Sequence, residues 1–388
     1  MASIVFSAGD PSGDAHAARL IDALRARDPS LRCAGLGGPA MQRAGLTLLE
    51  DLTKATAIGP FDAARHLARF VRAKRLLEAH LVNDRPDLVV LVDFGDYNLP
   101  VIAPLVKRHR LPILYYISPQ LWAWGRFRLR YVRRYVDRMV VFFPFEEAFY
   151  RRAGVAVTCV GHPLVDGLRP SLSREDARAH FGLNPWRRTV GLLPGSREDE
   201  VRRHLGLMLE AAARISWELP GVEFLLPKAP GLARAAIDAA VSRAGVSVCV
   251  AEGGLADALQ LMDAAVVASG TATLEAALCG VPMAVVYRTS WPTYLAARAV
   301  VRIPRIALVN IVGERLIVPE FVQQRATPGR VAQALIRLLR DEANSAEMKQ
   351  SLEGVRAKLG PPGAVGRAAS VVLELLHGKQ PETGSGTG

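Results

Sequence analysis

The sequence predicts an α/β protein of two doubly wound domains that face each other across a cleft. In both halves, short apolar runs alternate with amphipathic helical patterns, which is typical of parallel sheets covered by helices on both faces. Glycine-rich turns follow several of these runs, as expected at the ligand-binding edge of such sheets. The 388 residues, half of them hydrophobic, are enough material for two cores.

The first predicted strand, residues 3–7, leads into the turn AGDPSGD (8–14) and an amphipathic helix. Ser12 or Asp14 is expected to cap this helix, because both side chains can accept hydrogen bonds from free N–H groups. The spacing of the glycines does not fit G-x-G-x-x-G, so a dinucleotide fingerprint is not supported. His16 falls in the first helical turn, where it is more often a packed or capping residue than a catalyst.

A second informative segment is DLVVLVDFGDYN (87–98), in which Leu88–Val92 is predicted to be a strand buried on both faces. Asp93 follows at the carboxyl end of this strand. Partial burial there would raise its pKa and make it a usable general base. The alternative is an aspartate that caps a helix starting near Leu99, a role that suits Asp96 better than Asp93.

Positive charge is concentrated in the first half. Residues 62–152 contain 17 Lys/Arg and 9 Asp/Glu, which is most of the net charge of +12. The helical pattern 63–82 has one apolar stripe (Leu67, Phe70, Val71, Leu77 and Leu81) surrounded by arginines and lysine. The excess predicts an anionic partner, although arginine that replaces lysine on solvated faces would explain it equally well. An aromatic loop, ISPQLWAW (117–124), suits sugar stacking, an acyl pocket or a core wedge.

The second half begins after a polar, proline-bearing connection, so we predict domains at residues 1–166 and 167–345. Residues 346–378 are expected to form helices, with a return onto the first domain left open, and residues 379–388 are expected to be disordered. In this second domain, Gly195-Ser196-Arg197 follows one predicted strand and Ser269-Gly270-Thr271 follows another. The second of these turns and the helix after it offer N–H groups to a phosphate, and Arg197 of the first turn can clamp a diphosphate. Glu275, about one helical turn later, can accept hydrogen bonds from a ribose diol.

These motifs together resemble lipid-A-disaccharide synthase, a glycosyltransferase family with two Rossmann-like domains in the GT-B architecture. The segments that carry the resemblance are AGDPSGD (8–14), GLGGPAM (35–41), PDLVVLVDFGDYN (86–98), YYISPQLWAW (115–124), PFEEAFY (144–150), VGHPLVD (160–166), LLPGSREDEV (192–201), ASGTATLEAAL (268–278), PMAVVYR (282–288) and VNIVGERLIVPEFVQ (309–323).

The resemblance implies that UDP-2,3-diacylglucosamine donates its sugar to 2,3-diacylglucosamine 1-phosphate, with inversion at the anomeric carbon. It implies Asp93 as general base and Arg197 as the partner of the leaving UDP. The expected UDP-binding residues are Gly195, Ser196, Arg197, Ser269, Gly270, Thr271, Glu275 and Asn310, the last by match to the family. The expected acceptor-side residues are Ser12, Gly13, Asp14, Ser118 and Trp122. No metal or other cofactor is expected, because no DxD-type motif is evident.

The implied substrates are acylated anions, so the basic helices are expected to meet an anionic inner-membrane surface. We expect a cytoplasmic, peripherally attached protein: the N-terminus lacks the basic start of a signal peptide, the four cysteines form no close pair, and no run of 18 apolar residues is free of charge. The resemblance leaves a homodimer open. Asp10-Pro11 replaces the Glu-Ala usual in the family, and residues 57–62 also depart from its pattern, which puts acceptor detail in doubt.

Two other functions stay open from the sequence. A UDP-N-acetylglucosamine 2-epimerase would share the architecture and the SGT…E segment, but would not need the WAW loop or the basic first half. A basic, non-enzymatic nucleic-acid-binding protein would explain the charge. However, aromatic residues are not interleaved with basic ones in a nucleic-acid-binding motif, so no nucleic-acid partner is expected.

Overall fold

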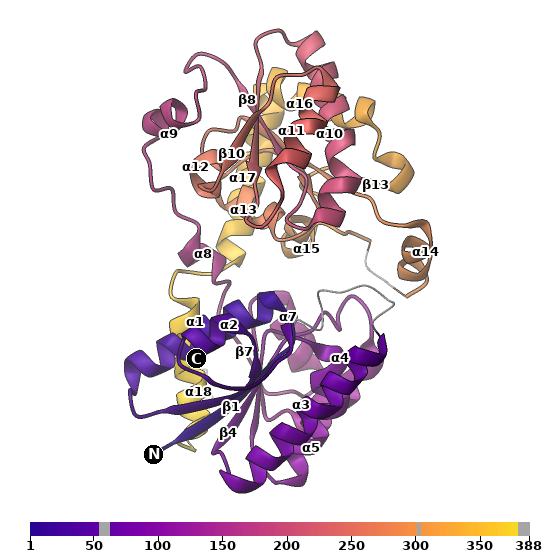
Figure 1. Cartoon of the computed structure of the whole chain (residues 1–388). Coiled ribbons are helices and arrows are strands. Elements are labelled where there is room, and N and C mark those ends of the chain that lie inside the picture. Colours follow the sequence, from indigo (N-terminus) through magenta and orange to yellow (C-terminus); the bar gives the residue numbers. More distant parts are fainter. Residues whose placement is uncertain (54–62, 301–303, 379–388) are drawn as a thin grey trace, which may run out of the picture. The chain divides into compact units, whose positions relative to one another are not determined.

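The protein is described by a computed structural model that covers residues 1–53, 63–300 and 304–378 (Figure 1). The predicted α/β class is confirmed: two parallel sheets alternate with helices along the chain. The chain divides into two compact units, residues 1–163 with 360–388, and residues 164–359. Residues 57–62, where the sequence departs from the family pattern, and the tail 379–388 lie outside the described residues.

The first unit contains a seven-stranded sheet in the order β3-β2-β1-β4-β5-β6-β7. Its strands are β1 (Ser3–Ala8), β2 (Arg32–Gly37), β3 (Thr47–Asp51), β4 (Leu88–Val92), β5 (Ile113–Tyr116), β6 (Arg138–Val141) and β7 (Val157–Cys159). All pairs are parallel, with Ile4 opposite Leu88 where β1 meets β4. Every residue of β4 is buried, as the continuous apolar run predicts. The chain order reverses between β1 and β4, and this is the point where doubly wound sheets bind ligands.

Helices cover both faces of this sheet (Figure 1). They are α1 (Pro11–Arg27), α2 (Pro39–Arg43), α3 (Ala63–Asn83), α4 (Gly95–Tyr97), α5 (Ala103–Arg108), α6 (Leu129–Tyr135), α7 (Pro144–Arg152) and α18 (Ala364–Leu376). A wide π-helical turn, Asn98–Ile102, joins α4 to α5. Helix α1 is capped by Asp10, whose side chain accepts from the N–H of Gly13, and Pro11 occupies its first turn. The expected cap at Ser12 or Asp14 is therefore wrong.

The second unit contains a six-stranded parallel sheet in the order β10-β9-β8-β11-β12-β13. Its elements are α8 (Leu164–Gly167), α9 (Arg174–His180), β8 (Thr189–Leu193), α10 (Glu198–Glu218), β9 (Glu223–Lys228), α11 (Arg234–Ala244), β10 (Cys249–Glu252), α12 (Leu255–Leu259), β11 (Ala264–Ala268), α13 (Ala272–Leu278), β12 (Met283–Tyr287), α14 (Trp291–Val300), α15 (Leu308–Gly313), β13 (Glu320–Val322), α16 (Pro328–Arg340) and α17 (Glu342–Lys358). Here the order reverses between β8 and β11, the strands that precede the two predicted phosphate turns.

The division of the C-terminal helices differs from the predicted boundary at residue 345. Helix α17 packs on α13, α15 and α16 within the second unit, whereas α18 packs on α1 in the first. The apolar face of α17 explains this: Met348, Leu352 and Val355 are buried. The first boundary falls between Pro163 and Leu164, three residues before the predicted position.

The predicted single stripe on the 63–82 helix is wrong. Leu77 and Leu81 are buried in the core, but Leu67 and Val71 are 66% and 41% exposed. Two of the surrounding arginines, Arg69 and Arg72, pair with Glu50 of β3 at 3.5 and 3.1 Å. The C-terminal half of α3 is thus a core helix, and its N-terminal half presents apolar side chains to solvent. The side chain of Arg65 lies outside the described residues.

Candidate functional site

Asp93 lies at the point where the order of the first sheet reverses, directly after β4. Asp93 and Phe94 both adopt left-handed backbone conformations, with φ of +42° and +48°. Such conformations are strained in residues with side chains, and they concentrate at functional sites. The helical segment then begins at Gly95, and Asp96 pairs with Arg128. Neither aspartate caps a helix with its side chain, so the capping alternative is wrong for both.

The strained turn at Asp93 is held by a buried amide. Asn98, at the start of the π-helical turn, donates from Nδ2 to the carbonyl oxygens of Ser7, Val92 and Asp93 at 3.0–3.2 Å. Its Oδ1 accepts from the hydroxyl of Ser7 at 2.8 Å, and the phenol of Tyr115 donates to the Asp93 carbonyl. These bonds join the ends of β1 and β4 and fix where the Asp93 carboxyl group lies.

The environment of Asp93 raises its pKa to about 7. Desolvation is the largest cause, and the negative charge of Asp10 is the second. The predicted direction of the shift is therefore confirmed. Asp10 is one of the residues that depart from the family pattern, and the structure places it within electrostatic range of the candidate base.

The three acceptor-side candidates of the first turn have different roles. Ser12 is exposed and Gly13 is buried with its N–H on Asp10. Asp14 is 4% exposed, and its carboxylate accepts from the N–H groups of Gly38, Ala40 and Met41 at 2.9–3.0 Å. Because its oxygens hold the start of α2, Asp14 positions this loop, and its place on the acceptor side stays a prediction.

Ser118 and Trp122, the two acceptor-side candidates in the aromatic loop, also form hydrogen bonds within the protein. The buried hydroxyl of Ser118 lies 2.7 Å from that of Tyr150. The indole of Trp122 donates to Glu146 at 3.2 Å and packs edge-on against Phe145. Glu146 is buried, and its pKa is raised to about 7, mainly by desolvation. Trp122 is therefore closer to the predicted core wedge than to a stacking platform.

In the second unit, the turn after β8 is occupied by a carboxylate. Glu200 Oε2 accepts from the N–H groups of Ser196 (2.9 Å) and Arg197 (3.3 Å), and Oε1 accepts from the Arg197 guanidinium at 2.9 Å. Gly195, with φ of +123°, allows this contact, because a Cβ there would lie 2.5 Å from the Glu200 Cβ. The N–H groups of Ser196 and Arg197 are therefore already bonded within the protein, and the expected UDP contacts of this turn stay predictions. The Arg197 side chain, 79% exposed, is available to a ligand.

The turn after β11, unlike the turn after β8, has no side chain packed against its glycine. Gly270, with φ of +156°, has no atom within 4 Å of the position a Cβ would take. The side chain of Thr271 makes no capping bond to α13, and the hydroxyl of Ser269 donates to the Ile306 carbonyl at 3.0 Å. Glu275 is partly buried, and desolvation raises its pKa. Because β8 and β11 are adjacent and parallel, this turn and Arg197 follow neighbouring strands at one edge of the sheet.

Asn310 is fully buried and its polar atoms all have partners within the protein. Its Nδ2 donates to the Val318 carbonyl (2.9 Å) and to Glu320 (2.8 Å), and its Oδ1 accepts from the N–H groups of Ile317 and Val318. Glu320 in turn accepts from the N–H of Ile306, whose carbonyl holds Ser269. Asn310 thus supports the segment that holds Ser269 of the turn after β11, and its expected contact with UDP stays a prediction.

His204 is a site residue that the sequence did not reveal. It lies on α10, is 2% exposed, and its Nε2 accepts from the N–H of Arg288 at 2.9 Å. Its Nδ1 must then carry the hydrogen and donate to the Pro194 carbonyl at 3.1 Å. Burial lowers its pKa, which keeps this neutral form. His204 thus ties the turn after β8 to the end of β12. Its place in an ordinary amphipathic pattern carries no signal of this role.

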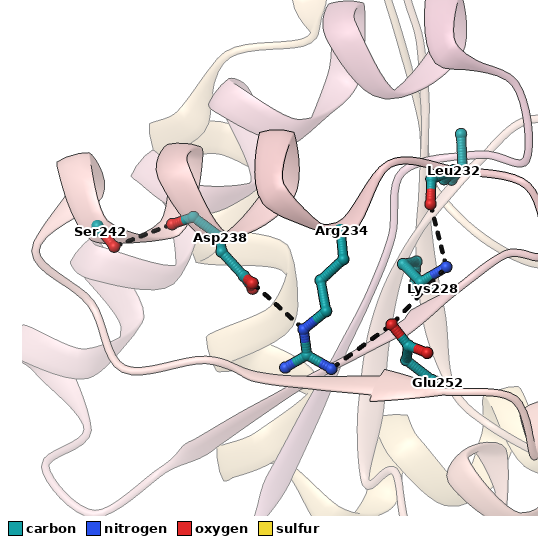
Figure 2. Close-up of polar contacts among 6 residues, drawn as sticks. All are labelled: Lys228, Leu232, Arg234, Asp238, Ser242 and Glu252. Carbon is teal, nitrogen blue, oxygen red and sulfur yellow. Dashed lines mark hydrogen bonds and ion pairs between the residues drawn. The ribbon is translucent and has the colours of Figure 1, made fainter.

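An ion-pair network stabilises the loop that follows β9 (Figure 2). Lys228, the last residue of β9, donates to the Leu232 carbonyl at 3.1 Å and lies 4.0 Å from Glu252 at the end of β10. Arg234 joins Glu252 (3.7 Å) to Asp238 (3.2 Å). Because the Arg234 pairs are half exposed, each contributes at most about 1 kcal/mol. Their effect is to order a loop that lies beside the turn after β8.

A metal centre and a membrane-spanning helix are two further features that the described part of the chain could hold. Within residues 1–53, 63–300 and 304–378, no group of three or more His, Cys, Asp or Glu side chains is arranged to hold a metal ion. Within the same residues, no helix combines the length and the apolar character needed to cross a membrane.

Comparison with known proteins distinguishes between enzymes that share this architecture. Among solved structures, a calicheamicin glycosyltransferase matches with a TM-score of 0.61 and 17% identity, covering 98% of this chain and all of its own. A UDP-N-acetylglucosamine 2-epimerase matches with a TM-score of 0.59 and 13% identity, covering 100% of this chain and 99% of its own. At such identities the likeness shows the fold alone, which transferase and epimerase share.

The comparisons of sequence, unlike those of fold, identify a single family. The lipid-A-disaccharide synthetase family model matches residues 4–371. The lipid-A-disaccharide synthase of Geobacter sulfurreducens is 41% identical over 377 residues, which cover 97% of this chain and 98% of the relative. That of Myxococcus xanthus is 41% identical over 373 residues, with 96% and 97% covered. With a match over nearly its whole length, the chain belongs to the lipid-A-disaccharide synthase family of glycosyltransferases.

Proposed function

We propose that the protein condenses UDP-2,3-diacylglucosamine with 2,3-diacylglucosamine 1-phosphate. The 6-hydroxyl oxygen of the acceptor attacks the anomeric carbon of the donor from the side opposite the diphosphate. The new C–O bond forms as the bond to the diphosphate oxygen breaks, and UDP leaves with the electron pair. The hydroxyl proton passes to the protein, and the product is the disaccharide 1-phosphate with inverted anomeric configuration.

The observation that carries this proposal is the Asp93 carboxyl group, whose pKa of about 7 suits a general base near neutral pH. Its place at the reversal point of the sheet supports the role, as does the strained backbone that is held by Asn98. The attacking hydroxyl needs a base that is ionised often enough to accept a proton and basic enough to keep it.

The leaving UDP gains negative charge, and the second unit offers positive partners for it. Arg197 is exposed at the turn after β8, and the neighbouring turn at Gly270 is open to a ligand. We propose that Glu275, on the helix after this turn, accepts hydrogen bonds from the ribose hydroxyls. Fixed donors of this kind stabilise developing charge without a metal ion. We therefore propose that EDTA leaves the rate unchanged; a rate that falls on chelation and recovers with Mg²⁺ would contradict this.

The direct test is mass spectrometry of the product formed from both substrates by the wild type, Asp93→Asn and Asp96→Asn. Asp96 is the matched control, because it is an exposed neighbour that pairs with Arg128. We expect Asp93→Asn to lose at least about a hundredfold in kcat and Asp96→Asn to stay close to wild type. Full activity of Asp93→Asn would refute the assignment of the base. UDP release without acceptor would favour the epimerase.

We further propose that the first unit attaches the protein peripherally to an anionic membrane on the cytoplasmic side. Exposed apolar side chains on its surface include Leu67, Val71, Trp124 and Phe127. Residues 126–134 add five arginines and no acid. Aromatic and apolar side chains beside arginine are typical of surfaces that bind the interface of anionic lipids.

Vesicle co-sedimentation tests this attachment. We expect Leu67→Ser with Phe127→Ser to reduce binding to phosphatidylglycerol vesicles several-fold, and Trp217→Ser, which removes an 84% exposed tryptophan from α10, to have little effect. Equal binding of all variants would contradict the proposal.

A further inference from the structure

Three polar rings in the first unit surround one phenylalanine. Phe142 follows β6, and its ring centroid lies 5.6 Å from that of His16, 5.6 Å from that of Tyr116 and 5.1 Å from that of His162. These residues come from α1, from the last position of β5 and from the segment after β7. Because the strands are parallel, the cluster lies at the edge of the sheet where their carboxyl ends meet, as Asp93 does.

Two polar atoms in this cluster are buried without a hydrogen-bond partner, namely the Tyr116 hydroxyl and His16 Nδ1. Tyr116 is fully buried. A buried donor or acceptor that stays unpaired is costly, so such groups are rare in folded proteins. Two of them against one phenylalanine ring indicate that a polar molecule completes the hydrogen bonding here.

Of the two charges that act on His16, that of Arg19 has the larger effect and favours an anion, whereas the carboxylate of Asp10 has the smaller effect and opposes it. Arg19, one turn after His16 on α1, is exposed and makes no ion pair with any described residue. Its positive charge acts on both His16 and Tyr116. Desolvation lowers the pKa of His16 to about 4, so this imidazole is neutral at pH 7 and can donate one hydrogen bond. A guanidinium with two neutral donors is a set that suits a phosphate monoester.

The position of the cluster relative to Asp93 indicates which kind of anion it would bind. The carboxylate of Asp10 acts electrostatically on both His16 and Asp93. The cluster and the base therefore lie close to the same group, at one edge of one sheet. A sugar phosphate whose hydroxyl reaches Asp93 would extend its phosphate toward such a cluster.

We propose that Arg19, His16 and Tyr116 form the subsite that holds the phosphate of the acceptor sugar. This inference rests on the proposed reaction and goes beyond it, because it assigns the anion contact of the acceptor to residues of α1 and β5. The subsite selects a phosphorylated acceptor and orients its hydroxyl toward Asp93. His162 and Phe142 form the wall behind it.

The experiment compares 2,3-diacylglucosamine 1-phosphate with 2,3-diacylglucosamine as acceptors for the wild type, Tyr116→Phe and Arg19→Gln. Tyr116→Phe removes one hydroxyl and keeps the ring, and Arg19 is exposed, so its replacement leaves the core intact. Arg43→Gln, at an exposed arginine of α2, is the matched control. We expect each subsite variant to raise the KM for the phosphorylated acceptor about tenfold to a hundredfold. The KM for the UDP-sugar and the turnover of the unphosphorylated acceptor should stay unchanged.

The preference of the wild type for the phosphorylated acceptor should therefore shrink in both variants and persist in Arg43→Gln. An equal loss on both acceptors would overturn the subsite, because it would show a purely structural role. Unchanged kinetics would overturn it as well, and would indicate that water fills the cluster. If the wild type released no UDP with either acceptor, the proposed reaction itself would fail, a result distinct from loss of the preference alone.

Discussion

At the scale of single residues, Asp93 combines a strained backbone with a carboxyl group that is largely removed from water. Its backbone is left-handed, and desolvation together with Asp10 raises its pKa to about 7. The two causes of the raised pKa can be separated by experiment. The burial of Asp93 is a property of the fold, whereas the charge of Asp10 can be removed by one substitution. Asparagine at position 10 would also keep the helix cap, since both residues are good N-caps.

The first prediction concerns the pH dependence of activity. A base must be ionised to act, so kcat/KM should rise with pH and level off above about 7. Asp10→Asn removes a negative charge near Asp93 and should move the midpoint to lower pH. Asp96→Asn should move it less, because Asp96 is the smallest of the causes that raise this pKa. A pH–rate profile for each variant checks this. Midpoints that coincide in all three proteins would contradict it.

The second prediction concerns stability. The pKa of Asp93 is about 7 in the folded protein and about 3.9 when unfolded, so between these values the folded state binds more protons. The stability that this group contributes is present below pH 4 and is lost as pH rises toward 7. The free energy of unfolding of Asp93→Asn, measured relative to that of wild type, should therefore be larger at pH 8 than at pH 5. Urea unfolding at both pH values measures this, and a difference independent of pH would contradict it.

At the scale of elements, the turn after β8 is built by contacts between side chains and backbone. Glu200 accepts from its N–H groups, and His204 holds the Pro194 carbonyl. Both residues belong to α10, so the helix that follows the turn also shapes it. Gly195 makes this packing feasible, because its φ of +123° and its missing Cβ leave room for Glu200.

The third prediction compares two glycines near this helix. Gly195→Ala should lower the free energy of unfolding by about 1–3 kcal/mol and raise the KM for the UDP-sugar, because the new Cβ would displace Glu200 and with it Arg197. Gly206→Ala, within α10 and with no atom within 4 Å of its Cβ position, should be neutral or stabilise by about 0.5–1 kcal/mol. Chemical denaturation and donor kinetics of the two variants measure these effects. Equal effects would refute the role of the turn.

At the scale of the whole molecule, the C-terminal segment belongs to the unit that the chain begins with. Helix α18 packs on α1 and buries Ala368, Ala369 and Val372. Arg367 donates to the carbonyls of Val160, Pro361 and Pro362 at 2.7–2.9 Å, and Arg27 donates to Ser370. The first unit is therefore incomplete without α18.

The fourth prediction follows from this connection. A chain that ends at Leu359 would expose the face of α1 that α18 covers, so the first unit should be destabilised and cleaved by protease more readily than in the full chain. A chain that ends at Gly378 retains α18 and should behave like wild type. Limited proteolysis followed by mass spectrometry locates the cuts. Equal resistance of the two shortened chains would contradict the role of α18.

Several features of the fold and the site could be predicted from the sequence because they depend on local pattern. The buried strand Leu88–Val92, the turns at Gly195 and Gly270, and the place of Asp93 at a strand end all follow from apolar runs and glycine positions. The family follows from motifs spread over the chain, and the comparisons confirm it. The base role of Asp93 and the UDP contacts remain predictions.

The structure decided how polar side chains are used, because this depends on neighbours that are distant in sequence. Asp14 and Asn310, which the sequence offers as ligand contacts, are each buried and bonded to backbone groups. His204, inconspicuous in its helix, joins two strand ends, and His16 and Tyr116 share the ring of Phe142. Local sequence determines which groups a chain carries to the edge of a sheet. Tertiary packing determines which of them are already paired, and so which can still meet a substrate.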